Sequence, residues 1–127
     1  MNNLSAYAPR MLAVLRIMSG LLLLAHGTQK FFGFPPSPRP SPELFSLLGA
    51  AGAIEIVCGV LLVIGLFTRP AAFLASGFAA FAYFIGHYPR GFFPASNGGD
   101  AAVLYCFVFL YIVFAGAGAW ALDSNRR

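Results

Sequence analysis

Six ionisable side chains lie inside apolar segments of the sequence or at their ends, where titratable groups are rare. They are Arg16, His26, Lys30, Glu55, His87 and Asp100. An ionisable group in an apolar environment is usually paired, neutralised or used in function. These six residues are therefore the candidates for binding or chemistry, and the elements that carry them have to bring them together.

Glu55 is the most informative of these residues, because it lies in the middle of the apolar sequence GAAGAIEIVCGV. Gly52, Glu55 and Gly59 fall in one helical sector, and glycines let a neighbouring backbone approach closely. We therefore expect Glu55 to face the interior of a helix bundle, toward the segment that contains His26. Two roles are open: Glu55 fixes the helix register through a hydrogen bond, or Glu55 and His26 handle protons as catalytic residues.

The two histidines, His26 and His87, allow three interpretations. They are satisfied interhelical histidines, or they relay protons or contact a quinone, or they bind a metal. Histidine with Glu55 or Asp100 supplies acceptable ligand types, but the sequence has no close metal-binding spacing, and three helices would have to assemble the site. We therefore predict no metal site.

The elements that position these residues are predicted to be membrane helices. Hydrophobic residues make up 59% of the 127-residue chain and charged residues 9%, against roughly 25% charged residues in soluble domains. Four apolar runs cover residues 11–32, 42–67, 70–87 and 100–122, and each can cross a hydrocarbon core that takes about 20 helical residues. None alternates like a strand. We predict one domain, residues 1–127, that is all-α and folds as an integral membrane antiparallel four-helix bundle.

The links between the runs carry turn residues. The proline-rich linker GFPPSPRPSPE precedes the second helix, which Pro42 is expected to open. Residues 68–70 are expected to form a tight turn that makes the second and third helices antiparallel neighbours. Residues 97–99 supply turn freedom before Asp100, whose charge favours the N-terminal end of the fourth helix.

Helical rise gives each polar group an approximate level in the membrane, at about 1.5 Å per residue. Lys30 and Asp100 fall at the same level, near the end opposite the termini, and we predict an ion pair between them. His26 falls close to the levels of Glu55 and His87. These residues form a predicted polar cluster in the outer half of the bundle.

Basic residues set the expected orientation. One side carries Arg10, Arg69, Arg126 and Arg127, and the other carries Lys30, Arg39 and Arg90. The positive-inside rule then favours cytoplasmic N and C termini, and Arg16 is expected to snorkel from the first helix to the cytoplasmic surface. No basic stripe is visible, so the predicted partner is the lipid bilayer and not a nucleic acid.

Processing and redox motifs give little further chemistry. The first run lacks a small-residue cleavage site, so we expect it to be retained rather than removed as a signal peptide. Cys58 and Cys106 fall at different levels and are predicted to be unpaired. The sequence has no CxxC motif, phosphate loop, nucleophile elbow or haem-attachment sequence.

Four segments together resemble the successive signatures of the DoxX family of small four-helix membrane proteins. They are VLRIMSGLLLLAHGTQKFFGF, GAIEIVCGVLLVIGLFTRPAA, the GGD of residues 98–100, and the terminal GAGAWALD. The matching positions are Arg16, His26, Gly27, Lys30, Glu55, Gly59, Thr68, Arg69 and Asp100. Asp100 stands where the family more often has Glu, and residues 116–123 replace a segment that often reads GPGRYSLD.

The resemblance implies a multi-pass protein of the bacterial or archaeal inner (plasma) membrane, associated with thiosulfate:quinone oxidoreductase or with membrane redox and oxidative-stress complexes. It makes quinone the candidate cofactor, with quinone or lipid as the ligand of the six-residue cluster. The favoured function is a small accessory subunit of a redox or biogenesis complex, with other membrane subunits or a homo-oligomer as partners. The alternative is a quinone-linked oxidoreductase component. The sequence has no haem, flavin or iron–sulfur signature, which favours the non-catalytic subunit.

Overall fold

The computed structural model describes residues 2–35 and 47–125. The regular elements among these residues are all helices, with no strand, which confirms the all-α prediction. The long helices are α2 (Ala8–Phe32), α3 (Leu47–Ile64), α4 (Thr68–Gly86) and α6 (Asp100–Ala115). The short elements are α1 (Asn2–Ser5), η1 (Tyr88–Arg90), α5 (Pro94–Asn97) and η2 (Leu122–Asn125).

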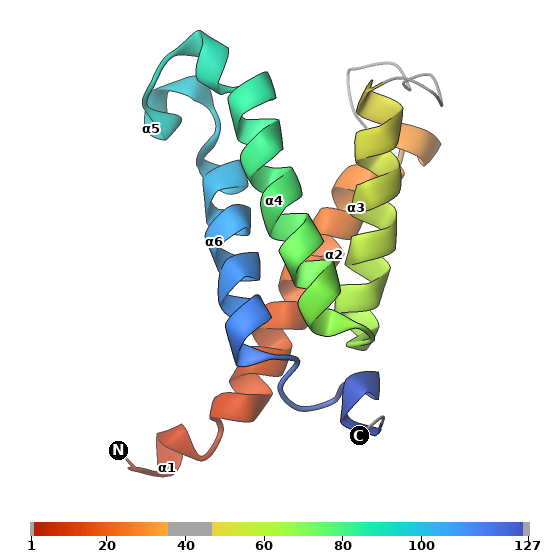
Figure 1. Ribbon diagram of the computed structural model, residues 1–127, viewed down its shortest axis with the longest axis vertical. Helices are drawn as coiled ribbons and strands as arrows, with labels where there is room; N and C mark the ends of the chain where they lie inside the picture. The colour runs from red at the N-terminus through yellow and green to blue at the C-terminus, as the bar shows by residue number, and fades with distance from the viewer. Residues whose placement is uncertain (1, 36–46, 126–127) are drawn as a thin grey trace.

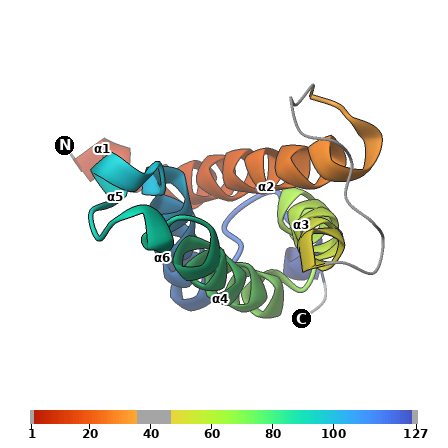
Figure 2. The ribbon, with the colours of Figure 1, turned by 90° about the horizontal axis from the view of Figure 1, so that it is seen from above.

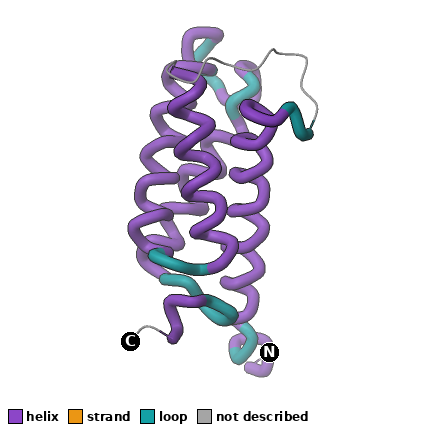
Figure 3. The backbone as a smooth tube through the Cα atoms, turned by 90° about the vertical axis from the view of Figure 1, so that its right-hand side faces the viewer, coloured by secondary structure: helices purple, strands orange, loops and turns teal. Residues whose placement is uncertain are grey.

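The long helices run along one axis with alternating direction, and both ends of the chain lie at the same end of the molecule (Figures 1 and 3). We call this end the base. Helix α2 packs mainly against α3, and α4 packs mainly against α6, while α3 and α4 join the two pairs. Seen from above, α2 and α3 lie on one side and α4 and α6 on the other (Figure 2). Helices α2 and α3, and helices α4 and α6, are consecutive long helices in the sequence and run antiparallel.

Helix boundaries follow the predicted runs closely in α2 and α4 but not elsewhere. The predicted turn at residues 68–70 is wrong, because α4 begins at Thr68 and the turn uses Gly65 (φ 72°) and Phe67 (φ 49°). The fourth helix ends at Ala115 and not at residue 122, because Gly116 takes φ 85°, a left-handed value that glycine adopts readily. The predicted start of the second helix at Pro42 lies outside the described residues.

Two segments are long and apolar enough to cross a membrane: Ala8–Phe32 and Thr68–Arg90. The segments Gly49–Ile64 and Asp100–Ala115 are apolar but shorter. By length and composition, the structure therefore supports two spans directly.

The core lies in the half of the molecule near the base. Leu62 of α3, Ala72 of α4, and Phe109 and Ile112 of α6 are fully buried and pack in one cluster. Small residues on α4, among them Ala71, Ala75 and Ala79, let the other helices approach it. Cys58 belongs to this core and is a free thiol, as is Cys106, which confirms the prediction that they are unpaired.

Gly59 sets the close contact between α2 and α3. A Cβ atom added at Gly59 would lie 2.9 Å from the Cα atom of Leu24, whereas a Cβ added at Gly77 on α4 would have nothing within 4 Å. We expect Gly59→Ala to destabilise the protein by about 1–3 kcal/mol, because the helix backbones would have to separate. Gly77→Ala is the matched control and should change stability by no more than about 1 kcal/mol, in the stabilising direction. Thermal unfolding in detergent measures both, and equal effects would contradict the close-contact role.

Candidate functional site

A pocket of about 500 Å³ lies between the α2–α3 pair and the α4–α6 pair, in the half of the molecule away from the base. Four predicted site residues line it: His26, Lys30, Glu55 and His87. Its other walls are mainly apolar and include Ile54, Phe78, Phe81 and Ile85. We call it the outer pocket. Because the core fills the half near the base, the polar cluster predicted in the outer half coincides with the space that the core leaves open.

An ion pair between Lys30 and Glu55 joins α2 to α3 at this pocket. The Lys30 Nζ atom donates to Glu55 Oε1 at 2.7 Å, and the two side chains are 23% and 7% exposed. Glu55 therefore faces the interior and contacts the first long helix, as predicted. The predicted ion pair between Lys30 and Asp100 is wrong, because the Lys30 ammonium turns toward α3. The position of Gly27 explains why Lys30 points toward α3. Gly27 faces Gly52 of α3, and Lys30, three residues later, lies on the same face of α2.

His26 presents its ring to the pocket from α2. The residue is exposed, and its ring meets the ring of Tyr105 on α6 edge-on, with centroids 6.0 Å apart. Tyr105 in turn stacks on Phe109, with centroids 5.7 Å apart. Within the described part of the chain, the structure records no hydrogen bond to the His26 imidazole or to the Tyr105 hydroxyl. Both groups are therefore placed to bind a ligand.

His87 follows the end of α4 and lines the outer pocket beside the loop that leads to α6. Its Nδ1 atom lies 3.3 Å from the Asn97 carbonyl oxygen. The buried Asn97 side chain donates to the Tyr83 hydroxyl at 3.0 Å and to the Gly91 carbonyl at 2.9 Å, and its Oδ1 accepts from Gly99 N at 2.8 Å. The sequence around Asn97 predicts only a turn. Its position next to two glycines gave no sign that its side chain would be buried.

Arg16 does not contribute to the outer pocket, and the prediction that it snorkels to the surface is wrong. Its side chain is fully buried near the base. Its guanidinium donates to the carbonyl oxygens of four residues, one in α3 and three in the segment after α6: Leu62, Ala117, Ala119 and Trp120. Arg16 therefore fastens the C-terminal segment against the helices.

Asp100 lies outside the residues that line the outer pocket. It is exposed in the first turn of α6, where a carboxylate interacts favourably with the N-terminal end of the helix, as predicted. Among the described residues, no group of three His, Cys, Asp or Glu side chains could hold a metal ion. The outer pocket thus combines one ion pair, imidazole and phenol groups, and apolar walls, a set that can hydrogen-bond the polar end of an otherwise apolar ligand.

Comparisons with known proteins agree with the sequence signatures. The family model described as DoxX matches residues 11–88. A chain of Haemophilus influenzae, described as an uncharacterized protein, is 50% identical over 98% of this chain and 97% of its own length. A chain of Mycobacterium tuberculosis, described as an uncharacterized membrane protein, is 27% identical over 96% of this chain and 85% of its own length. No solved structure matches the chain.

Proposed function

The chain belongs to the DoxX family, and on this premise we propose that it is a multi-pass protein of the inner membrane that holds a quinone in the outer pocket, as an accessory subunit of a membrane redox complex. Membership supports a membrane location, since a relative is described as a membrane protein. The observation that carries the binding role is the outer pocket itself, where ionisable groups from three helices meet an apolar wall.

A four-span arrangement is supported by the apolar surface of all the long helices. Large exposed hydrophobic side chains occur on each of them, for example Leu22 on α2, Val57 on α3, Phe73 on α4 and Phe107 on α6. Soluble monomers rarely expose apolar surface on this scale. Helices α3 and α6 are short, but a bilayer can thin locally around a short helix at a modest free-energy cost. With four spans, both termini lie on one side, and the positive-inside rule assigns that side to the cytoplasm.

The residues of the outer pocket fit a quinone. The Lys30 ammonium and the His26 imidazole can donate hydrogen bonds to carbonyl oxygens, and the apolar walls suit a ring and an isoprenoid tail. A bound quinone would supply two-electron redox chemistry, which the side chains of this protein do not provide. Glu55 and His26 can take up and release protons beside it, and Lys30 holds the Glu55 carboxylate in place.

Filling the outer pocket tests this proposal. Ala82 of α4 lines the pocket, and Ala53 of α3 is exposed outside its lining. We expect Ala82→Phe to lower the quinone content of the purified protein at least tenfold, because the ring would occupy the ligand space. Ala53→Phe adds the same volume outside the pocket and should retain the quinone. Extraction and chromatography of the bound quinone measure both, and equal contents in the two variants would contradict the proposal.

The quinone-linked oxidoreductase component remains the second candidate, because Glu55 and His26 both line the pocket and could serve proton transfer. The two functions differ in what the purified protein does alone. An accessory subunit should copurify with a stoichiometric membrane partner and should not reduce quinone by itself. Quinone reduction by the isolated protein with thiosulfate as the electron donor, and loss of this activity in Glu55→Gln, would favour the second candidate.

A further inference from the structure

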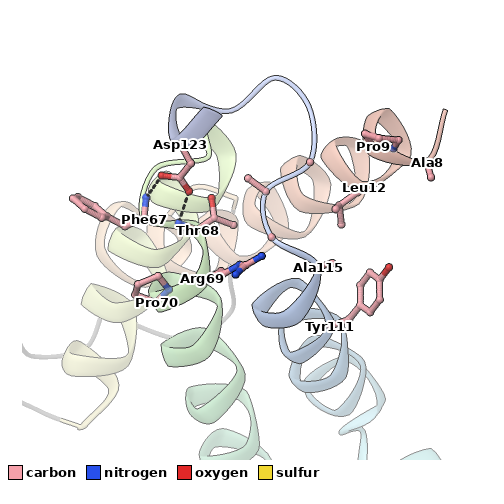
Figure 4. Close-up of a pocket in the computed structure, with 13 residues that line it drawn as sticks. Ala8, Pro9, Leu12, Phe67, Thr68, Arg69, Pro70, Tyr111, Ala115 and Asp123 are labelled. Carbon is pink, nitrogen blue, oxygen red and sulfur yellow. Dashed lines mark hydrogen bonds between the residues drawn. The ribbon is translucent and has the colours of Figure 1, made fainter. Parts of the chain in front are cut away.

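A second pocket, of about 850 Å³, opens at the base of the molecule. It is lined by the starts of α2 and α4, the end of α6 and residues 116–118, with Asp123 at its edge (Figure 4). We call it the base pocket. Its lining shares no residue with that of the outer pocket, so it is a separate candidate site.

Arg69 supplies a cation in the base pocket. Its side chain extends from the first turn of α4 toward the end of α6 (Figure 4). The guanidinium lies against Gly116, where an added Cβ atom would be 3.1 Å from Arg69 Nη2. The residue is exposed, and the structure records no ion pair or hydrogen bond from its guanidinium to another described residue. In contrast, the carbonyl oxygens of four residues bind Arg16. The fork of Arg69 donors is therefore available to a ligand.

Thr68 supplies a second group without a partner. The residue is 1% exposed and lines the base pocket. Its Oγ1 atom is buried and has no hydrogen-bond partner among the described residues. Leaving a buried hydroxyl unpaired is unfavourable, and such a group calls for an unseen partner. Thr68 and Arg69 both line the base pocket, so one ligand group in the pocket can approach both.

The carboxylate of Asp123 decides where that ligand group can bind. Its two oxygens accept hydrogen bonds from the backbone N–H groups of Phe67 and Thr68, at 2.8 Å each. The N-terminal end of α4 therefore already has an anion, supplied by the chain itself. A second anion would therefore be drawn to the Arg69 guanidinium, which supplies a positive charge in the same pocket.

We propose that the base pocket binds a phosphate group, carried by the head group of a membrane lipid, with the Arg69 guanidinium and the Thr68 hydroxyl as donors. A planar guanidinium binds phosphate oxygens through two parallel hydrogen bonds. The pocket has a volume typical of small-molecule sites and lies at the helix ends, where lipid head groups lie in a four-span protein. Exposed Phe67 and Tyr111 border it and can contact acyl chains.

Native mass spectrometry of the delipidated full-length protein tests the proposal. The probes are phosphatidylglycerol, inorganic phosphate and diacylglycerol, which lacks phosphate. We expect phosphatidylglycerol adducts on the wild type, few with diacylglycerol, and at least a tenfold loss of adduct in Arg69→Gln. Arg10→Gln is the matched control, because Arg10 lies at the same end of the molecule but outside the lining of the pocket. A phosphate-dependent rise in melting temperature without a lipid adduct would assign free phosphate as the ligand and still support the phosphate site.

Thr68→Val separates a ligand group from an unpaired hydroxyl that is merely tolerated. Valine keeps the shape and removes the hydroxyl, so the lipid-free protein should melt at the same or a higher temperature. If Thr68 binds phosphate, the same variant should lose at least threefold in phosphatidylglycerol adduct. Adduct levels unchanged in both Thr68→Val and Arg69→Gln, or reduced equally in Arg10→Gln, would overturn the proposal.

Discussion

Replacing Arg16 with methionine is expected to destabilise the protein by about 3–5 kcal/mol, the largest effect of any single substitution considered for this chain. The buried guanidinium satisfies the carbonyl oxygens of four residues, Leu62, Ala117, Ala119 and Trp120. Methionine fills a similar volume but donates no hydrogen bond, so these oxygens would be left without their partner. The segment after α6 should then detach from the base.

Lysine at the same position gives a graded result. Arg16→Lys keeps the charge but loses the planar fork, and three donors on one atom cannot reach carbonyls spread around a guanidinium. We expect a loss of about 2 kcal/mol, between wild type and methionine. Arg10→Met is the control, since Arg10 is exposed and its recorded contact is with the Tyr7 ring. Thermal unfolding in detergent, with proteolysis after residue 115 as a second readout, measures each. A methionine variant as stable as wild type would show that the carbonyls find other partners.

The error over Arg16 shows what counting along the sequence leaves out. The count placed Arg16 near the base, where the structure has it. A single helix over residues 100–122, which the apolar run predicts, leaves no segment to cover the arginine. Left-handed values at Gly116 and Gly118 end α6 early and return the chain over the base, where Asp123 caps α4. Glycine permits this conformation but does not demand it, so the sequence alone could not predict the fold-back.

The ion pair at the outer pocket shows a second limit of sequence-based prediction, which concerns the direction in which a side chain points. Levels along the helices grouped Lys30, Glu55, His26 and His87 in the outer half, and these residues do line one pocket. Levels say nothing of rotation about a helix axis, and so they predict Asp100, at the same level, as the partner of Lys30. The glycine pattern contained the missing information: Gly27 and Lys30 lie on one face of α2, and Gly52 and Glu55 lie on one face of α3. Close approach of those faces brings Lys30 to Glu55.

Lys30 and Glu55 should respond unequally when each is changed alone. Lys30→Met is expected to destabilise the protein by about 2–3 kcal/mol, because Glu55 is almost fully buried and would lose its cation. Glu55→Gln should have a smaller effect, about 1 kcal/mol, since the amide can still accept a hydrogen bond and the flexible lysine can reach the membrane interface. The double variant should be no less stable than Lys30→Met, which gives a coupling energy above about 1 kcal/mol. Additive effects would mean that the pair contributes no specific stability.

The same variants decide whether Glu55 has a role beyond packing. Glu55→Gln keeps the shape of the carboxyl group but cannot exchange a proton, so a residue that only fixes the register of α3 should tolerate it. If Glu55 handles protons beside a bound quinone, Glu55→Gln should retain the quinone and the partner subunits yet lose at least tenfold in quinone turnover by the assembled complex. Lys30→Met, in contrast, should lose bound quinone in addition to turnover, because the Lys30 ammonium is a proposed hydrogen-bond donor to the quinone. Full turnover in Glu55→Gln would remove the proton-handling role and leave Glu55 as the anchor that holds Lys30 against α3.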